Sequence, residues 1–156
     1  MYETEYPQGA SHKSRALLFD RAGQFICLGR IKPGKSVYHV TVGGTMESGE
    51  TTEAALAREL KEEIDATAVI GRAFLTVLDT TYHVALSLRL GPNPFTGPEF
   101  ADRSLGRYSI TRVPLSKAMN PEFDLQPVLL QDFFRDYGGA VLAEVKRLDG
   151  LTHQHR

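Results

Sequence analysis

Gly44 to Ala66 read GTMESGETTEAALARELKEEIDA, a glycine-containing turn followed by a helix rich in glutamate. Glu59, Glu62 and Glu63 are spaced i, i+3 and i+4, so they project from one helical face. Three carboxylates gathered on one face repel each other unless positive charge lies among them. A divalent cation is the natural candidate, because hard oxygen ligands suit Mg²⁺ or Mn²⁺ and magnesium is commonly shared with substrate phosphates.

An ordinary surface helix could carry the same acids without a metal. Acidic residues on a helix usually form a solvated face, and Arg58 could simply pair with Glu62 one turn later. Leu56, Leu60 and Ile64 form an apolar stripe beside the acids, as amphipathic helices commonly do. The ELKEE run alone therefore does not separate a metal site from a charged surface.

The longer pattern resembles the Nudix box: Gly, five residues, Glu, seven residues, Arg-Glu, an aliphatic residue, any residue, Glu-Glu, any residue, Gly and an aliphatic residue. The matching positions are Gly44, Glu50, Arg58, Glu59, Leu60, Glu62 and Glu63. Asp65 replaces the last glycine, and Ala66 stands at the final aliphatic position. A helix often ends in a left-handed residue, which Asp tolerates better than most side chains. We interpret the replacement of the last glycine by Asp65 as a local free-energy cost at the end of the helix.

The resemblance implies a fold, a reaction and a set of site residues. The implied fold is of the α/β class, a Nudix-type α/β/α sandwich with a mixed β-sheet. The implied reaction is the hydrolysis of a nucleoside diphosphate linked to another moiety. Carried over by position, Glu59, Glu62 and Glu63 are expected to bind Mg²⁺ or Mn²⁺, with a backbone carbonyl of Gly43 or Gly44 completing the ligand set.

Glu50 and Arg58 complete the expected catalytic set. Their ion pair would orient the loop of the box against the helix that carries the metal ligands. The general base is open between a glutamate of the box and an acid in a later loop, where Glu99 and Asp102 lie. For both later acids the alternative is a solvated surface carboxylate.

Basic residues ahead of the glycines are candidates for contacts with substrate phosphates. Arg30, Lys32 and Lys35 flank this part of the chain, and Arg15 begins the first expected strand. A solvated basic side chain is the alternative for each of them.

Two tyrosines are candidates for binding the rest of the substrate. Tyr38 and His39 are neighbours on a strand, so only one can face the cleft, and we favour Tyr38 stacking on a base. Tyr82 follows Asp65 by seventeen residues, a distance that resembles the signature of dinucleoside polyphosphate hydrolases. Burial in the core explains either tyrosine equally well.

The chain of 156 residues predicts a single domain. We expect a loose N-terminal arm over residues 1–13, one domain over 14–150 and a disordered end over 151–156. Strands are expected in RALLFD, QFICLGRI, SVYHVTV, TAVIGRAFLTVLDTT, YHVALSLRL and RYSITRVPL, with a long functional loop before the last. Helical spacing then predicts two helices separated by Gly138 and Gly139.

Composition excludes several classes of protein. A net charge of −1 argues against a nucleic-acid groove built on general electrostatics, and no apolar stretch is long enough to span a bilayer. The single Cys27 cannot form an internal disulfide, so the cytoplasm is the expected compartment. The expected partner is a small nucleotide or other diphosphate, with a homodimer as an open possibility.

Two alternatives to a metal-dependent pyrophosphohydrolase remain. A Nudix-like module could bind a nucleotide without hydrolysing it, although such modules usually lose the glutamates that this chain retains. An isomerase of isoprenyl diphosphates also carries a box-like helix. It depends on an acid–base cysteine, whereas Cys27 lies early and in an expected strand.

Overall fold

The computed structural model describes residues 11–31, 33–34, 36–96, 100 and 107–153. The first described elements form the expected hairpin, in which β1 (Lys13–Phe19) pairs antiparallel with β2 (Phe25–Ile31). Gly23 has a φ of 81° in the connecting turn, a conformation that glycine adopts without steric cost.

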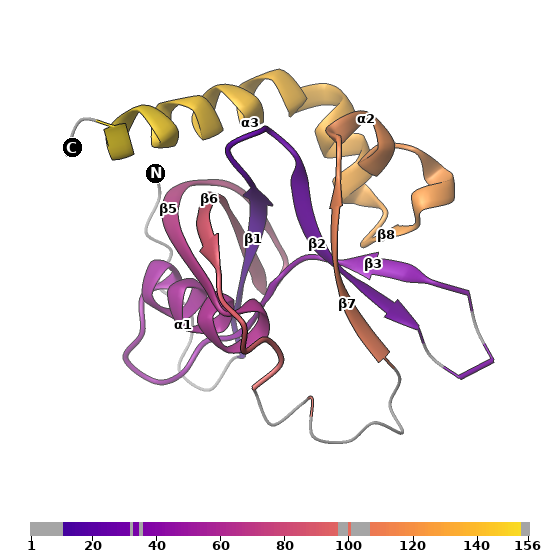
Figure 1. The fold of residues 1–156 in the computed structure, drawn as a ribbon, viewed down its shortest axis with the longest axis horizontal. Coiled ribbons are helices and arrows are strands. Elements are labelled where there is room, and N and C mark those ends of the chain that lie inside the picture. The colour runs from indigo at the N-terminus through magenta and orange to yellow at the C-terminus, as the bar shows by residue number, and fades with distance from the viewer. Residues whose placement is uncertain (1–10, 32, 35, 97–99, 101–106, 154–156) are drawn as a thin grey trace.

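The other described residues supply six more strands and the helices. In chain order these are β3 (Tyr38–Val40), β4 (Gly43–Thr45), α1 (Thr52–Ile64), β5 (Ala66–Val77), β6 (Thr80–Leu90), β7 (Arg107–Val113), α2 (Leu115–Ala118), the 3-10 helix η3 (Pro121–Phe123), β8 (Leu125–Gln126) and α3 (Leu129–His153). Figure 1 shows their arrangement in space.

The strands form one mixed sheet of eight strands. Its main order is β5-β6-β1-β2-β3-β8, with β4 paired to β1 and β7 paired to β2. The pairs β1–β6 and β3–β8 are parallel, and the other pairs are antiparallel. The pairing of β4 with β1 holds the expected glycine turn as a short strand against the first residues of β1.

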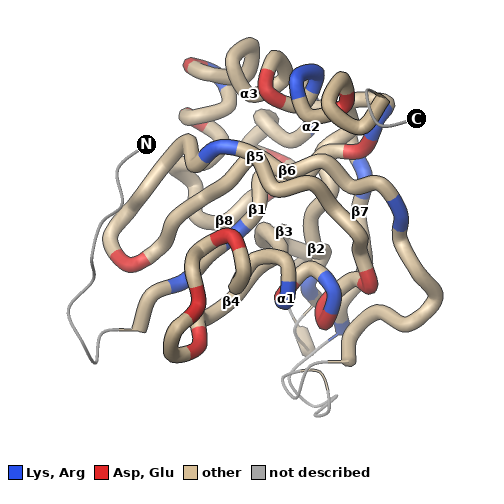
Figure 2. Tube along the Cα trace, turned by 90° about the vertical axis from the view of Figure 1, so that its left-hand side faces the viewer, with Lys and Arg blue, Asp and Glu red and all other residues tan. Residues whose placement is uncertain are grey.

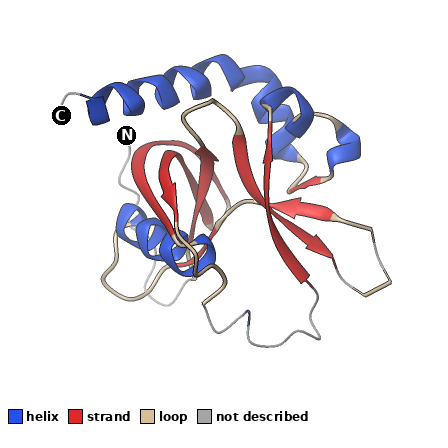
Figure 3. Ribbon diagram, viewed as in Figure 1, coloured by secondary structure: helices blue, strands red, loops and turns tan. Residues whose placement is uncertain are grey.

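Helices lie on both sides of the sheet and divide the core in two (Figure 3). One cluster packs between α1 and the sheet and includes Leu18, Ile26, Leu56 and Leu60. The other packs between α3 and the opposite face and is centred on aromatic residues such as Phe134. Strands carry alternate side chains to opposite faces, so β1 and β2 contribute to both clusters. The predicted α/β class with a mixed sheet is confirmed.

The prediction of two C-terminal helices is wrong, because α3 runs without interruption through both glycines to His153. Glycine in a helix interior costs about 1 kcal/mol relative to alanine. Buried side chains on both sides of the pair, Phe134 and Val141 among them, offset that cost through tertiary packing. Gly138 also permits close contact, since a Cβ there would lie 3.1 Å from Leu115.

The expected chain ends differ slightly from the observed elements. Lys13 already belongs to β1, and residues 151–153 are the last turn of α3. Among the described residues, no helix combines the length and apolarity needed to cross a bilayer.

Candidate active site

Helix α1 is fixed at both ends by polar side chains. The Thr51 hydroxyl accepts a hydrogen bond from the Ala54 N–H at 3.1 Å, as an N-cap residue should. At the other end Asp65 is left-handed, with φ 51° and ψ 40°, as predicted from its replacement of the box glycine. Its carboxylate accepts a bond from the Asn93 N–H at 3.1 Å and lies 2.5 Å from Lys61. These contacts lower the pKa of Asp65, with the bond from Lys61 as the main cause.

The glycine turn lies directly against two of the box glutamates. The Gly43 N–H donates to Glu63 Oε1 at 2.8 Å. A Cβ on Gly44 would lie only 2.6 Å from Glu59 Oε1. Glu59 and Glu63 are 7% and 5% exposed, so both carboxylates lie between the helix and the turn. Burial of this kind is costly for a carboxylate unless positive charge or donors accompany it.

Arg58 supplies positive charge to this group of carboxylates. Its Nε and Nη2 each donate to Glu50 at 2.9 Å, a two-point ion pair. Nη1 donates to Glu59 Oε1 at 3.0 Å, and Nη2 donates to the Thr45 carbonyl at 3.1 Å. The contact between Arg58 and Glu62, which would be the pairing expected of a simple surface helix, is longer at 3.5 Å. Arg58 therefore joins the loop to the helix, and Figure 2 shows acidic positions along this loop and α1.

This network changes the acidity of its members. The hydrogen bonds from Arg58 hold the pKa of Glu50 below its ordinary value. The same bonds to Glu50 raise the pKa of Arg58 further above its already high value. Both groups are therefore charged over the whole physiological pH range.

The residues present suit a hard divalent cation in their chemistry. Glu59, Glu62 and Glu63 offer carboxylate oxygens, and Gly44 leaves open the space beside Glu59 that any Cβ would fill. Within the described ranges, no three or more His, Cys, Asp or Glu side chains lie in an arrangement that could hold a metal ion. In this arrangement the Arg58 guanidinium neutralises the Glu59 carboxylate, as a bound metal ion would.

Three of the predicted substrate contacts lie on the sheet. Arg30 and Tyr38 are directly opposed across β2 and β3, and both are partly exposed. His39 points to the other face, where its ring stacks on Phe123 at 3.7 Å. Arg15 donates to the Thr41 carbonyl at 2.8 Å, so this side chain supports the connection between β3 and the glycine turn.

Tyr82 lies away from the box glutamates. It is 3% exposed and belongs to the cluster beneath α3, on the face of the sheet opposite α1. Burial raises the pKa of its hydroxyl. This position corresponds to the core-packing alternative for Tyr82. Lys32, Lys35, Glu99 and Asp102 lie outside the described residues.

Phe95 and Thr96 lie in the long loop that the sequence predicted to be functional, but neither residue was singled out as part of the site. The Phe95 N–H donates to the Glu63 carbonyl at 2.8 Å, and the Thr96 N–H donates to the Glu62 carbonyl at 2.9 Å. These bonds satisfy carbonyls at the end of α1 and fix residues 95 and 96 beside the box glutamates. The loop length was the only signal for a function here.

Cys27 has the properties of a core residue. Its side chain is fully buried, and burial raises the pKa of the thiol to about 12. A thiol of that acidity is protonated at neutral pH and is a poor acid–base group. The isomerase alternative therefore has no support from Cys27.

Comparison with known proteins agrees with this geometry. The NUDIX domain model matches residues 12–109, more than half of the chain. The chain therefore belongs to the Nudix family. Helix α1 and the turn before it carry the residues of the Nudix box. No curated protein matches the chain.

Several solved structures share the fold at low sequence identity. The solution structure of the E. coli ORF135 protein aligns with a TM-score of 0.55 at 17% identity, covering 83% of this chain and 91% of that one. A NUDIX hydrolase from Nitrosomonas europaea gives 0.55 at 12% identity, covering 83% and 89%. A MutT protein from Methanosarcina mazei Go1 gives 0.53 at 17% identity, covering 83% and 94%. At these identities the similarity concerns the fold.

Proposed function

We propose that the protein is a metal-dependent pyrophosphohydrolase that cleaves a phosphoanhydride bond in a nucleoside diphosphate linked to another moiety. A nucleoside triphosphate, a nucleotide sugar and a dinucleoside polyphosphate all belong to this class. One observation carries the proposal: the carboxylates of Glu59 and Glu63 are buried against a glycine turn that has no side chain to cover them. We also propose that the protein acts in the cytoplasm and that its partner is a small molecule.

Glu59, Glu62 and Glu63 would hold Mg²⁺ or Mn²⁺, with a carbonyl of Gly43 or Gly44. When bound, the ion neutralises phosphate oxygens and lowers the pKa of a coordinated water. Glu50 fixes Arg58 through two hydrogen bonds, and Arg58 in turn positions Glu59 and the Thr45 carbonyl. The chain thereby sets the carboxylates in place before a substrate arrives, which avoids a cost of ordering during the reaction.

A substrate panel with and without Mg²⁺ tests this function. The wild-type protein is incubated with nucleoside triphosphates, nucleotide sugars and dinucleoside polyphosphates, and the phosphate or pyrophosphate released is measured. Glu63→Gln keeps the shape of the side chain but removes its charge, so we expect most metal-dependent turnover to be lost while the melting temperature changes little. Glu53→Gln is the matched control, since Glu53 is exposed in the first turn of the same helix.

Two outcomes would contradict the proposal. Turnover that is unchanged in Glu63→Gln would remove the box helix from the reaction. Nucleotide binding without release of any product across the panel would instead favour the alternative of a non-hydrolysing Nudix-like module.

A further inference from the structure

The sheet face that packs against α1 continues as a row of three side chains. Arg30 on β2 is directly opposite Tyr108 on β7 and Tyr38 on β3. Opposed residues of neighbouring strands point to the same face of a sheet. The next positions on that face, two residues along each strand, pack in the core beneath α1. They are Leu28, Ile110 and Val40.

The row lies where α1 no longer covers the face. The helix packs chiefly on β5, β4 and β1, whereas the row belongs to β3, β2 and β7. Arg30, Tyr38 and Tyr108 are all partly exposed. A half-open surface of two aromatic rings and one guanidinium therefore borders the core of the α1 side.

Arg30 has an unused hydrogen-bond donor in this row. Its Cζ lies 5.1 Å from the centroid of the Tyr108 ring, within the range of a cation–π contact. Its Nε is buried and, among the residues that the structure describes, finds no acceptor. A buried donor without an acceptor costs about 1 to 3 kcal/mol. Because Nε is buried, a ligand with a flat acceptor edge would recover that cost when the Arg30 side chain turns toward it.

Phe95 and Phe100 border the row and connect it to α1. The Phe100 ring meets Tyr108 edge-on at a centroid distance of 4.8 Å, and Phe95 lies 6.2 Å from Tyr108. Phe95 has a φ of 62°, a left-handed conformation that a bulky residue adopts only where its surroundings fix it. The bond from its N–H to the Glu63 carbonyl provides that constraint. This bond therefore fixes Phe95 beside the turn of α1 that carries Glu63.

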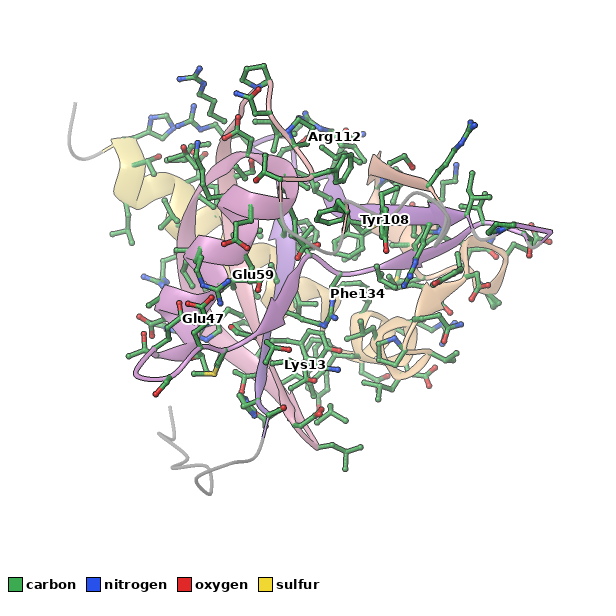
Figure 4. All side chains as sticks on the ribbon, turned by 90° about the horizontal axis from the view of Figure 1, so that it is seen from below. Lys13, Glu47, Glu59, Tyr108, Arg112 and Phe134 are labelled. Atoms are coloured by element: carbon green, nitrogen blue, oxygen red, sulfur yellow. The ribbon has the colours of Figure 1, made fainter. Side chains whose placement is uncertain are left out.

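We propose that Arg30, Tyr38 and Tyr108, bordered by Phe95, bind the aromatic base of a nucleotide. The base would stack on a tyrosine ring and accept a hydrogen bond from Arg30, while the phosphates extend toward Glu63. The inference rests on the proposed function and assigns the residues that hold the base of such a substrate. It also gives Arg30 a contact with the base in place of the predicted contact with phosphate. Glu59, on α1, and Tyr108 can both be followed in the view from below (Figure 4).

Equilibrium binding without metal tests the site separately from catalysis. Adenosine, guanosine, cytidine and uridine 5′-monophosphate are titrated into the full chain in EDTA by calorimetry, with ribose 5-phosphate as the ligand that lacks a base. We expect at least one nucleotide to bind at least about 10-fold more tightly than ribose 5-phosphate, the gain typical of one stacked base. Tyr108→Leu and Arg30→Gln should each weaken that nucleotide by about 5- to 100-fold and leave ribose 5-phosphate unchanged.

Matched variants control for the loss of a ring or a charge elsewhere. Tyr137→Leu removes an exposed ring on α3, and Arg107→Gln removes an exposed charge next to Tyr108, on the opposite face of β7. Neither should change nucleotide binding. Melting temperatures of all variants establish that each is folded.

The outcomes separate this inference from the proposed reaction. Ribose 5-phosphate binding as tightly as every nucleotide, or binding that is unchanged in both Tyr108→Leu and Arg30→Gln, would overturn the base site even if the enzyme hydrolyses diphosphates. Conversely, base-dependent binding that both variants weaken would uphold the site even if no substrate is hydrolysed, and the proposed reaction would then fail alone.

Discussion

Replacing Gly44 with alanine should disable the enzyme without unfolding it. Gly44 is not among the residues with a positive φ, so its backbone accepts an L-residue. The new methyl group would lie 2.6 Å from Glu59 Oε1 and 2.7 Å from its Cδ. The atoms in its way are thus the movable end of a side chain, and the backbone can stay where it is.

The size of the effect follows from this contact. Glu59 Oε1 must retreat from 2.6 Å to at least 3.4 Å for an ordinary contact, a shift of about 0.8 Å. A misplacement of roughly 1 Å in a catalytic group can cost about 100-fold in rate, so we expect turnover to fall about 10- to 100-fold. The bond from Arg58 to Glu59, now 3.0 Å, is weakened, and a partly exposed pair contributes only about 1 kcal/mol to stability.

Gly43→Ala is the contrasting variant one residue earlier. Gly43 has a φ of 145°, and its Cβ would meet the Ser14 carbonyl and Arg15 Cα, which are backbone atoms of β1. A side chain in that conformation costs about 1 to 3 kcal/mol, and forced packing costs about 1 to 3 kcal/mol more. For a chain of this size the melting temperature falls about 2 to 4 °C per kcal/mol. We expect a decrease of at least about 4 °C.

Thermal unfolding and steady-state kinetics on the best substrate of the panel decide between the two effects. The reasoning predicts that Gly44→Ala melts within about 4 °C of wild type but loses turnover, and that Gly43→Ala loses stability. It would be refuted if Gly44→Ala kept full turnover, or if its melting temperature fell as far as that of Gly43→Ala.

Two further predictions concern stability and its dependence on pH. Glu144 is 4% exposed and accepts bonds from the Arg72 N–H at 2.9 Å and from Arg147 at 2.6 and 2.8 Å. Because Arg147 is partly exposed and can bond to water, Glu144→Ala should cost about 1 to 3 kcal/mol, chiefly by leaving the Arg72 N–H on β5 unpaired. Urea unfolding measures this change, and a loss below about 1 kcal/mol would contradict it. The pKa of Glu50 is lower in the folded protein than its ordinary value of 4.5, so its bonds to Arg58 stabilise the fold above that pH and are lost as pH falls through the lowered pKa. Melting temperatures of wild type and Glu50→Gln should therefore converge as the pH is lowered below about 4.5, and a constant difference down to pH 2 would argue against it.

Local chemistry in the sequence was enough to predict the box helix. Thr51 begins it, Asp65 ends it in a left-handed conformation, and the spacing of Glu59, Glu62 and Glu63 places them on one face. The pairing of Glu50 with Arg58 was also predictable, because the box fixes both positions. The α/β class with a mixed sheet followed from the same resemblance and from the order of strands and helices.

The partners of these residues across the fold were decided only by tertiary structure. Alternation along a strand gives two faces but not which of them a helix will cover, so Tyr82 beneath α3 and Tyr38 beside Arg30 could not be separated by sequence. The uninterrupted α3 shows the same limit, since packing on both sides of Gly138 outweighs local helix propensity. The spacing of side chains along one helix or strand follows from covalent geometry, whereas contacts between distant strands depend on how the whole core packs.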